Sequence, residues 1–193
     1  MATIDWSAGT WLHPPPEHTI DGSELIVVTA EESDFWNETG YGFTHYSGHA
    51  LLADFPPNTA MEVEFSAEWT NEFDQAGLMI HADEKNWIKA GVELADGALG
   101  LGAVVTATRS DWSVGHVPDW MNKRIRIRVS RTSDALTVRA RTPEHPWRLV
   151  RLAPIDPQLP WRAGPLAASP SKSTLAVTFH CWEASEADPR IHS

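Results

Sequence analysis

Polar and aromatic side chains alternate with apolar ones in the stretch FDQAGLMIHADEKNWIKAGVE, residues 73–93. If its two arms pair as a hairpin with His81 opposite Trp87, one face carries groups suited to ligand binding. These are Gln75, His81, Trp87, Lys89 and Glu93. A tryptophan ring can stack on a sugar, while amide, ammonium and carboxylate groups can hydrogen-bond its hydroxyls. The row is therefore a candidate ligand-binding surface.

The two glycines on this face, Gly77 and Gly91, would leave room for a ligand, because glycine inside a strand often marks close approach by another group. The alternative is a solvated sheet face on which Lys89 and Glu93 pair only with each other. Such an exposed pair contributes at most about 1 kcal/mol to stability. The sequence leaves both interpretations open.

Two further segments place an aspartate beside a tryptophan, SDFW at 33–36 and SDWS at 110–113. An aromatic ring next to a carboxylate suits sugar recognition, and loops often carry the binding residues of rigid β-sandwiches. We therefore add Asp111, Trp112 and Trp36 to the candidate ligand-binding residues. The alternative is that the aspartates cap turns while the tryptophans fold back over the core.

Catalytic carboxylates are the next possibility, since glycosidases place two of them around the bond that they cleave. Glu62 and Glu64 share one face of the strand MEVEFSAEW, but the alternation of this strand also fits the polar outer face of a sheet. We predict no catalytic residue. The alternative is a glycoside hydrolase or sugar-modifying enzyme that uses Glu93 or Glu64.

The sequence gives little support for binding of a metal, a cofactor, a nucleic acid or a membrane. No HxH, HExxH, CxxC or Asp-rich loop is present, so no metal and no cofactor are predicted. The net charge of −11 argues against nucleic acid and against anionic membranes as partners. The single cysteine, Cys181, favours a reducing compartment and alternates with Val177 and Phe179, which predicts a core position. Without a signal-like start or an apolar span, we expect a cytoplasmic protein.

Ten short runs rich in β-branched and aromatic residues predict strands, and no window shows a helical period. They cover 23–30, 49–55, 61–69, 76–82, 86–94, 101–108, 123–131, 135–142, 147–153 and 174–182. This number of strands in one chain predicts an all-β fold, a two-sheet antiparallel β-sandwich of jelly-roll type, as a single domain over 1–193. Within the hairpin, the register predicts a buried face opposite the candidate site. That face is formed by Ala76, Leu78, Ile80, Ile88, Ala90 and Val92.

The ordered set of FDQAGLMIHADEKNWIKAGVE, VVTATRSDWS, RIRIRVSR, WRLVRLA and GPLAASP resembles the DUF1349 family of regulation-of-enolase-like proteins. The upstream run TAEESDFWNETGYGF fits the same pattern, so the resemblance spans about residues 10–182. It implies a concanavalin A-like lectin/glucanase sandwich. It also implies that the candidate row lies where such sandwiches often bind sugars. The family has no assigned reaction, so the resemblance implies a fold rather than an activity.

We interpret the chain as a non-catalytic binding module for a carbohydrate or a small polar ligand, held on the concave face of one sheet. Besides the enzyme alternative, a protein-interaction or regulatory role remains open, in which an aromatic-rich surface contacts a partner protein. The sequence does not indicate an oligomeric state.

Overall fold

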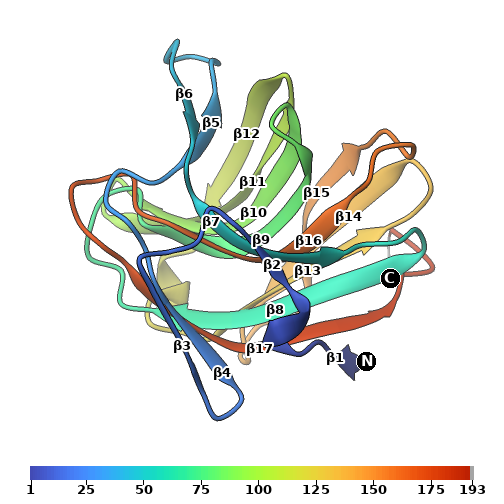
Figure 1. Cartoon of the computed structure of the whole chain (residues 1–193), viewed down its shortest axis with the longest axis horizontal. Coiled ribbons are helices and arrows are strands. Elements are labelled where there is room, and N and C mark those ends of the chain that lie inside the picture. The colour runs from blue at the N-terminus through green and yellow to red at the C-terminus, as the bar shows by residue number, and fades with distance from the viewer. Residues whose placement is uncertain (192–193) are drawn as a thin grey trace.

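The computed structural model describes residues 1–191 and consists almost entirely of strands, arranged as two large antiparallel sheets and one small hairpin (Figure 1). The all-β sandwich predicted from the sequence is confirmed. Two 3-10 turns, η1 (Trp6–Ala8) and η2 (Pro118–Trp120), are the other regular elements of this part of the chain. None of the helical turns in residues 1–191 is long and apolar enough to cross a membrane.

The sheet that we call the back sheet has eight strands. Its spatial order is β15 (Arg148–Pro154), β14 (Ala135–Arg141), β13 (Ile125–Arg131), β8 (Thr59–Ala67), β17 (Ala176–Glu186), β4 (Glu24–Val28) and β3 (Glu17–Asp21), with β1 (Ala2–Thr3) also paired to β17.

The front sheet has seven strands and carries the candidate site. Its spatial order is β12 (Arg109–His116), β11 (Ala98–Ala107), β10 (Asn86–Ala95), β9 (Gln75–Asp83), β16 (Arg162–Ala168), β7 (His49–Asp54) and β2 (Thr10–Leu12).

The predicted register of the 73–93 hairpin is confirmed, with His81 opposite Trp87 and Gln75 opposite Glu93. Because side chains alternate along a strand, this register sends the apolar set from Ala76 to Val92 into the main core between the two sheets. The same alternation turns the polar row to the outer side of the front sheet.

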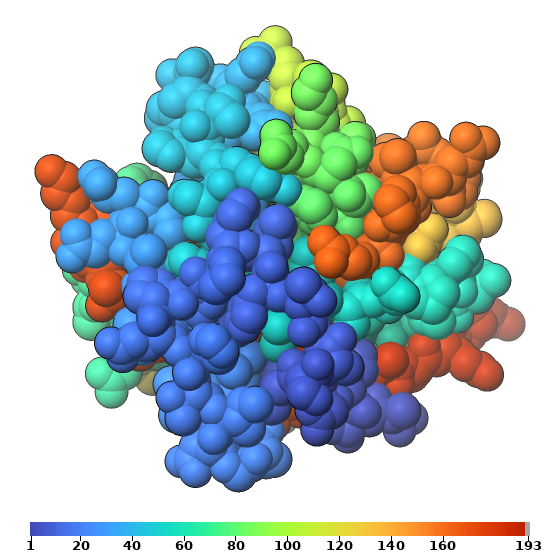
Figure 2. Space-filling model, viewed as in Figure 1, coloured from blue at the N-terminus to red at the C-terminus, as the bar shows by residue number. Residues whose placement is uncertain are grey.

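A second, smaller core lies on that outer side, because the hairpin formed by β5 (Phe35–Asn37) and β6 (Thr44–Tyr46) folds over part of the front sheet. Figure 1 shows this hairpin standing beside β12, away from the back sheet. In Figure 2 its atoms gather with those of the turns near residues 85 and 110. The hairpin is bound there by hydrogen bonds from the Asn37 side chain to the carbonyls of Glu84 and Thr108, at 3.2 and 3.3 Å.

Seven strands lie outside the ten predicted runs, namely β1, β2, β3, β5, β6, β12 and β16, and four of them carry a local reason for being missed. β5, β6 and β2 are only three residues long, too short for a periodic signal. β16 contains Pro165, which lacks the N–H that a central strand donates. Its ladder to β7 pairs Ala163 with Ala53 and Leu166 with Ala50, so the proline falls between these pairs.

The prediction that Cys181 sits in the core is wrong. A register irregularity in β17 between Phe179 and Cys181 shifts the alternation by one residue. Val177, Phe179 and Trp182 therefore remain in the core, while the thiol lies 3.3 Å from an Nη of Arg126 on the outer face of the back sheet. Burial raises the pKa of this thiol above its usual value.

The glycines of the polar row hold their strands close together. Gly77, Gly91 and Gly102 form one line across β9, β10 and β11. A Cβ added to Gly91 would lie 2.1 Å from the carbonyl oxygen of Ala76, far inside contact distance. The strands therefore need glycine for their own packing, and the absence of side chains also lowers the floor of the site.

Candidate functional site

A cleft of about 610 Å³, which we call the front cleft, opens between the β5–β6 hairpin and the front sheet. Its volume falls in the range of small-molecule sites, roughly 300–1,000 Å³. It is lined by Glu32, Asp34, Trp36, Tyr41, Phe43, His45, Phe73, Gln75, Lys89, Glu93, Val104, Trp112 and Pro170. Polar groups therefore come from β9, β10 and the segment before β5, and most of the rings come from loops and from β12.

Lys89 is the only ammonium group among the cleft-lining residues, and it is already engaged. Its Nζ donates to Asp34 Oδ1 at 2.9 Å and to Gln75 Oε1 at 2.7 Å. Gln75 Nε2 completes the triangle by donating to the same Asp34 oxygen at 3.1 Å. A buried ammonium is stable only when it is paired in this way. The triangle thus fixes the cleft floor and joins it to the segment that begins the hairpin.

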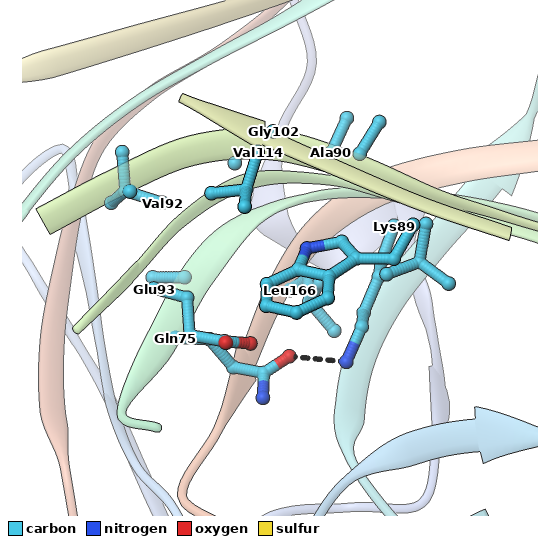
Figure 3. Close-up of a pocket in the computed structure, with 14 residues that line it drawn as sticks. Gln75, Lys89, Ala90, Val92, Glu93, Gly102, Val114 and Leu166 are labelled. Atoms are coloured by element: carbon cyan, nitrogen blue, oxygen red, sulfur yellow. Dashed lines mark hydrogen bonds between the residues drawn. The ribbon is translucent and has the colours of Figure 1, made fainter. Parts of the chain in front are cut away.

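Glu93 lies beside this triangle but does not join it. Figure 3 shows Gln75, Lys89 and Glu93 projecting from one side of the sheet, with Ala90 and Val92 on the other. The Glu93 carboxyl makes no side-chain hydrogen bond or ion pair with any of residues 1–191. Burial, only partly offset by the charge of Lys89, raises its pKa to about 7, and Asp34 and Glu72 raise it further. The cleft therefore contains a carboxyl that titrates near neutral pH.

Four exposed rings form the rim of the cleft. The exposed fractions are 64% for Tyr41, 43% for Phe43, 47% for Phe73 and 41% for Trp112. Tyr41 and Phe43 stack with 5.3 Å between ring centroids, so their orientation is mutually fixed. Large rings exposed together are unusual on a soluble domain and commonly mark a binding surface.

Trp87, predicted from the sequence to stack on a ligand, is fully buried with an exposed fraction of 0%. It does face the predicted side of the sheet, but the β5–β6 hairpin covers it. Its ring packs 5.7 Å from that of Phe35, and its Nε1 donates to the Glu84 carbonyl at 3.3 Å. Trp87 is thus the anchor of the hairpin and cannot be a stacking platform.

His81 is also covered by the hairpin. Its Nε2 forms a short hydrogen bond with the Tyr46 hydroxyl, and it does not line the front cleft. Burial, with the nearby charge of Arg162, lowers the pKa of His81 to about 4. The ring is therefore neutral at physiological pH and serves to hold β6 on the sheet. The prediction that His81 belongs to the ligand-binding surface is corrected accordingly.

The two residues of the Asp–Trp pair at 111–112 face opposite ways, since they are adjacent on a strand. Trp112 lines the cleft, whereas Asp111 turns away and pairs with Arg151 of β15 at 2.8 Å. The prediction that Asp111 contacts the ligand is therefore wrong. Trp36, predicted with them, does line the cleft, but it is mostly buried and meets the Trp112 ring edge-on with centroids 6.4 Å apart.

Glu64, the alternative catalytic residue, lies on the outer face of the back sheet. It pairs with Arg126 at 3.2 Å and with Arg124 at 3.6 Å, and Glu62 beside it is bound by the same Arg126 at 3.3 Å. The whole core of the sandwich separates this network from Glu93. The two carboxylates named for an enzyme therefore cannot act on one bond.

Sequence reasoning predicted Trp112 but missed the other three rings of the rim. Tyr41 and Phe43 lie in TGYGF, where Gly40 and Gly42 flank Tyr41 and precede Phe43, so no strand pattern singled them out. Phe73 adopts a φ of 69°, which fits a turn rather than the strand that follows it. Asp34 belongs to the SDFW segment that suits either sugar recognition or a cap, and its Oδ1 does accept from the Phe35 N–H at 2.7 Å. The signal that could have found the rim is the clustering of aromatic residues among glycines.

The described residues contain no group of three or more His, Cys, Asp or Glu side chains arranged to hold a metal ion. Stacking, hydrogen bonding and charge pairing are available from the rings, the floor triangle and Glu93.

Comparison with known proteins agrees with this geometry at the level of family and fold. Residues 11–187 match the model of a protein family of unknown function, DUF1349. The chain is 35% identical to Regulation of enolase protein 1 of Saccharomyces cerevisiae over 180 residues, 91% of this chain and 88% of the yeast protein. A crystal structure of a functionally unknown protein from the same yeast matches with a TM-score of 0.89 and 34% identity, covering 95% of this chain and 98% of the yeast chain.

A more distant match is a xylan β-1,4-xylosidase from Bacillus halodurans, with a TM-score of 0.67 and 11% identity. The match covers 96% of this chain but 39% of that enzyme. At this identity the likeness concerns the fold alone.

Proposed function

This chain belongs to the DUF1349 family, and from that premise we propose that it is a non-catalytic binding module that holds a carbohydrate or a similar small polar ligand in the front cleft. The observation that carries the proposal is the combination of an aromatic rim with a polar floor in one open cleft. Rings cover the apolar face of a ligand, while the floor offers fixed hydrogen-bonding groups.

The polar floor of the cleft is preorganised for ligand binding. Lys89, Gln75 and Asp34 hold one another in place, so binding would cost little ordering of these side chains. Lys89 has one ammonium N–H beyond these two bonds, which could reach a ligand oxygen, whereas both Nε2 hydrogens of Gln75 are used, one by Asp34 and one by the Phe73 carbonyl at 3.3 Å. Such prearranged donors and acceptors are what recognition of a polyhydroxylated ring requires.

Hydrolysis has weaker support than binding. Of the two carboxylates that line the floor, Asp34 is held through Oδ1 by Lys89, by Gln75 and by the Phe35 N–H, which gives this oxygen a structural role in the floor. Glu93 alone cannot supply both the acid and the base of a glycosidase.

Replacement of Trp112 by Ala tests the proposal, because this ring is exposed and lines the cleft. We expect the affinity for a bound sugar to fall about tenfold or more, as expected for a ring at the centre of a contact. Calorimetric titration of a panel of neutral and charged glycans measures it. Trp147→Ala is the matched control, because Trp147 is a partly exposed tryptophan that packs on Arg141 outside the cleft.

Two results would contradict the proposal. One is that no glycan of the panel binds wild-type protein with a Kd below about 10 mM. The other is that binding occurs but Trp112→Ala and Trp147→Ala leave it equally unchanged.

A further inference from the structure

We propose that the ligand of the front cleft carries a positively charged nitrogen, which docks against Glu93 beneath the aromatic rim. For a carbohydrate ligand, this means an amino sugar with a free amine. The inference rests on the proposed function, since it names the ligand class of the same cleft.

The charge balance of the cleft is the first support. Three carboxylates line it, those of Glu32, Asp34 and Glu93, against the single ammonium of Lys89. The Lys89 ammonium forms its ion pair with Asp34 at 2.9 Å, so no cationic side chain of the cleft pairs with Glu32 or Glu93. Glu32 is exposed to water, whereas Glu93 is partly buried, so the uncompensated charge inside the cleft is that of Glu93. A cationic ligand would complete the balance, and a neutral sugar would not.

The second support is the absence of any partner for Glu93 within residues 1–191. Buried carboxylates in native proteins are normally paired or hydrogen-bonded, because an unpaired one is costly. Gly91 and Gly100 border the same small hollow as Glu93, and no side chain of theirs fills it. The carboxyl thus faces space that a ligand atom could occupy.

The third support is the kind of wall around that space. Tyr41, Phe43, Phe73 and Trp112 present exposed rings to the cleft, and aromatic faces attract cations within about 6 Å of the ring centroid. Rings alone also stack on neutral sugars. A positive charge in this cleft would be attracted both by the ring faces and by the unpaired carboxylate. A neutral sugar gains only the stacking, so the combination favours a cationic ligand.

Binding should therefore depend on pH through Glu93. The charged groups that face it are Lys89 on its own strand, Asp34 before β5 and Glu72 before β9. Glu32 and His45 line the same cleft. A cation binds the ionised carboxylate, and the pKa of Glu93 in the free protein is about 7. The affinity for a permanently charged ligand should rise about tenfold from pH 6 to pH 8.

The experiment uses two pairs of probes that differ in charge but little in shape. The first pair is choline and its neutral analogue 3,3-dimethylbutan-1-ol, and the second is glucosamine and glucose. Titrations of wild-type protein by NMR or calorimetry at pH 7 should show that the charged member of each pair binds about tenfold more tightly. The choline titration repeated at pH 6 and pH 8 should show the rise described above.

Glu93→Gln should abolish the pH dependence and reduce the preference for charge to the part that the aromatic rings supply. Glu72→Gln is the matched control: it removes a nearby acid that lies outside the cleft lining and instead accepts a hydrogen bond from the Asp96 N–H, and it should keep the preference. His45→Gln should keep the pH dependence.

The inference is overturned if the neutral members bind as well as the charged ones, or if Glu93→Gln retains the full preference or the pH dependence. Glycan binding without a charge preference would overturn this inference and leave the proposed function standing. Failure of every glycan and every probe to bind would overturn both.

Discussion

Replacement of Trp87 by Ala should lower the free energy of unfolding by about 3–5 kcal/mol, the cost of removing a fully buried tryptophan. The ring is completely buried, and it lies between the front sheet and Phe35 of the β5–β6 hairpin. Its loss would leave a cavity under the hairpin and release the Nε1 hydrogen bond to the Glu84 carbonyl. Because whole domains are stable by only about 5–15 kcal/mol, the effect would be large.

Urea unfolding of the variant, followed by fluorescence and circular dichroism, measures this loss. Trp112→Ala serves as the control, because the Trp112 ring is largely exposed and its removal should change stability by less than about 1 kcal/mol. If Trp87→Ala unfolded at the same urea concentration as wild type, the hairpin would not be packed on this ring as described. Any loss of ligand binding in Trp87→Ala would then need another explanation.

Replacement of Glu93 by Gln should stabilise the protein while weakening its preference for a positively charged ligand. Its folded-state pKa of about 7 lies above 4.5, the usual pKa of a glutamate, so the native state holds the proton more tightly than the unfolded state does. Stability from this group is therefore present below about pH 4.5 and is lost as the pH rises to about 7. The amide mimics the protonated form, so the variant should gain up to about 3 kcal/mol at pH 8 and about 1 kcal/mol at pH 5.

Thermal or urea unfolding of wild type and Glu93→Gln at pH 5 and pH 8 measures the difference. His81 contributes a slope of the opposite sign, because its pKa is lowered to about 4 and its stabilising effect is lost as the pH falls from 6.5. The comparison of variant with wild type at each pH removes this contribution. Equal stability of the two proteins at pH 8 would show that Glu93 is not desolvated in the cleft.

The Glu93 carboxyl lowers the stability of the fold at neutral pH, so the reason for its presence is to be sought in function rather than in stability. Buried or strained groups that cost stability are typical of binding and catalytic sites. Glu93 fits that pattern, whereas the buried carboxylate of Glu62 on the back sheet is compensated by Arg126 and Arg128. The contrast between the two carboxyls is why we place the function in the front cleft.

The alternation of the 73–93 segment was enough to predict its register, because a slip of one residue would have exposed Leu78, Ile80 and Ile88. The same reasoning placed Gln75, Lys89 and Glu93 on one face, and the structure brings these three into one cleft. Local pattern therefore predicted the floor of the site.

The local sequence pattern did not predict that the β5–β6 hairpin covers part of the polar row. Burial of Trp87 and His81 depends on a hairpin 35 residues or more away in the sequence, whose short strands give no periodic signal. The direction of Asp111 follows from its place on β12, a strand that no predicted run covered, and Arg151 at the edge of the other sheet pairs with it there. Long-range packing of this kind decides which residues of a polar row remain open to a ligand, and the sequence of the row alone does not contain it.

An NMR titration with the indole N–H groups as probes decides whether a ligand occupies the front cleft. The chain has ten tryptophans, each a separate reporter. As a bound sugar or amino sugar is added, the Trp112 resonance should move most and Trp36 beside it should follow. Trp147 and Trp182 should stay in place, because neither lines the cleft. Saturable binding that leaves Trp112 unmoved, or that moves Trp147 or Trp182 instead, would contradict the proposed site.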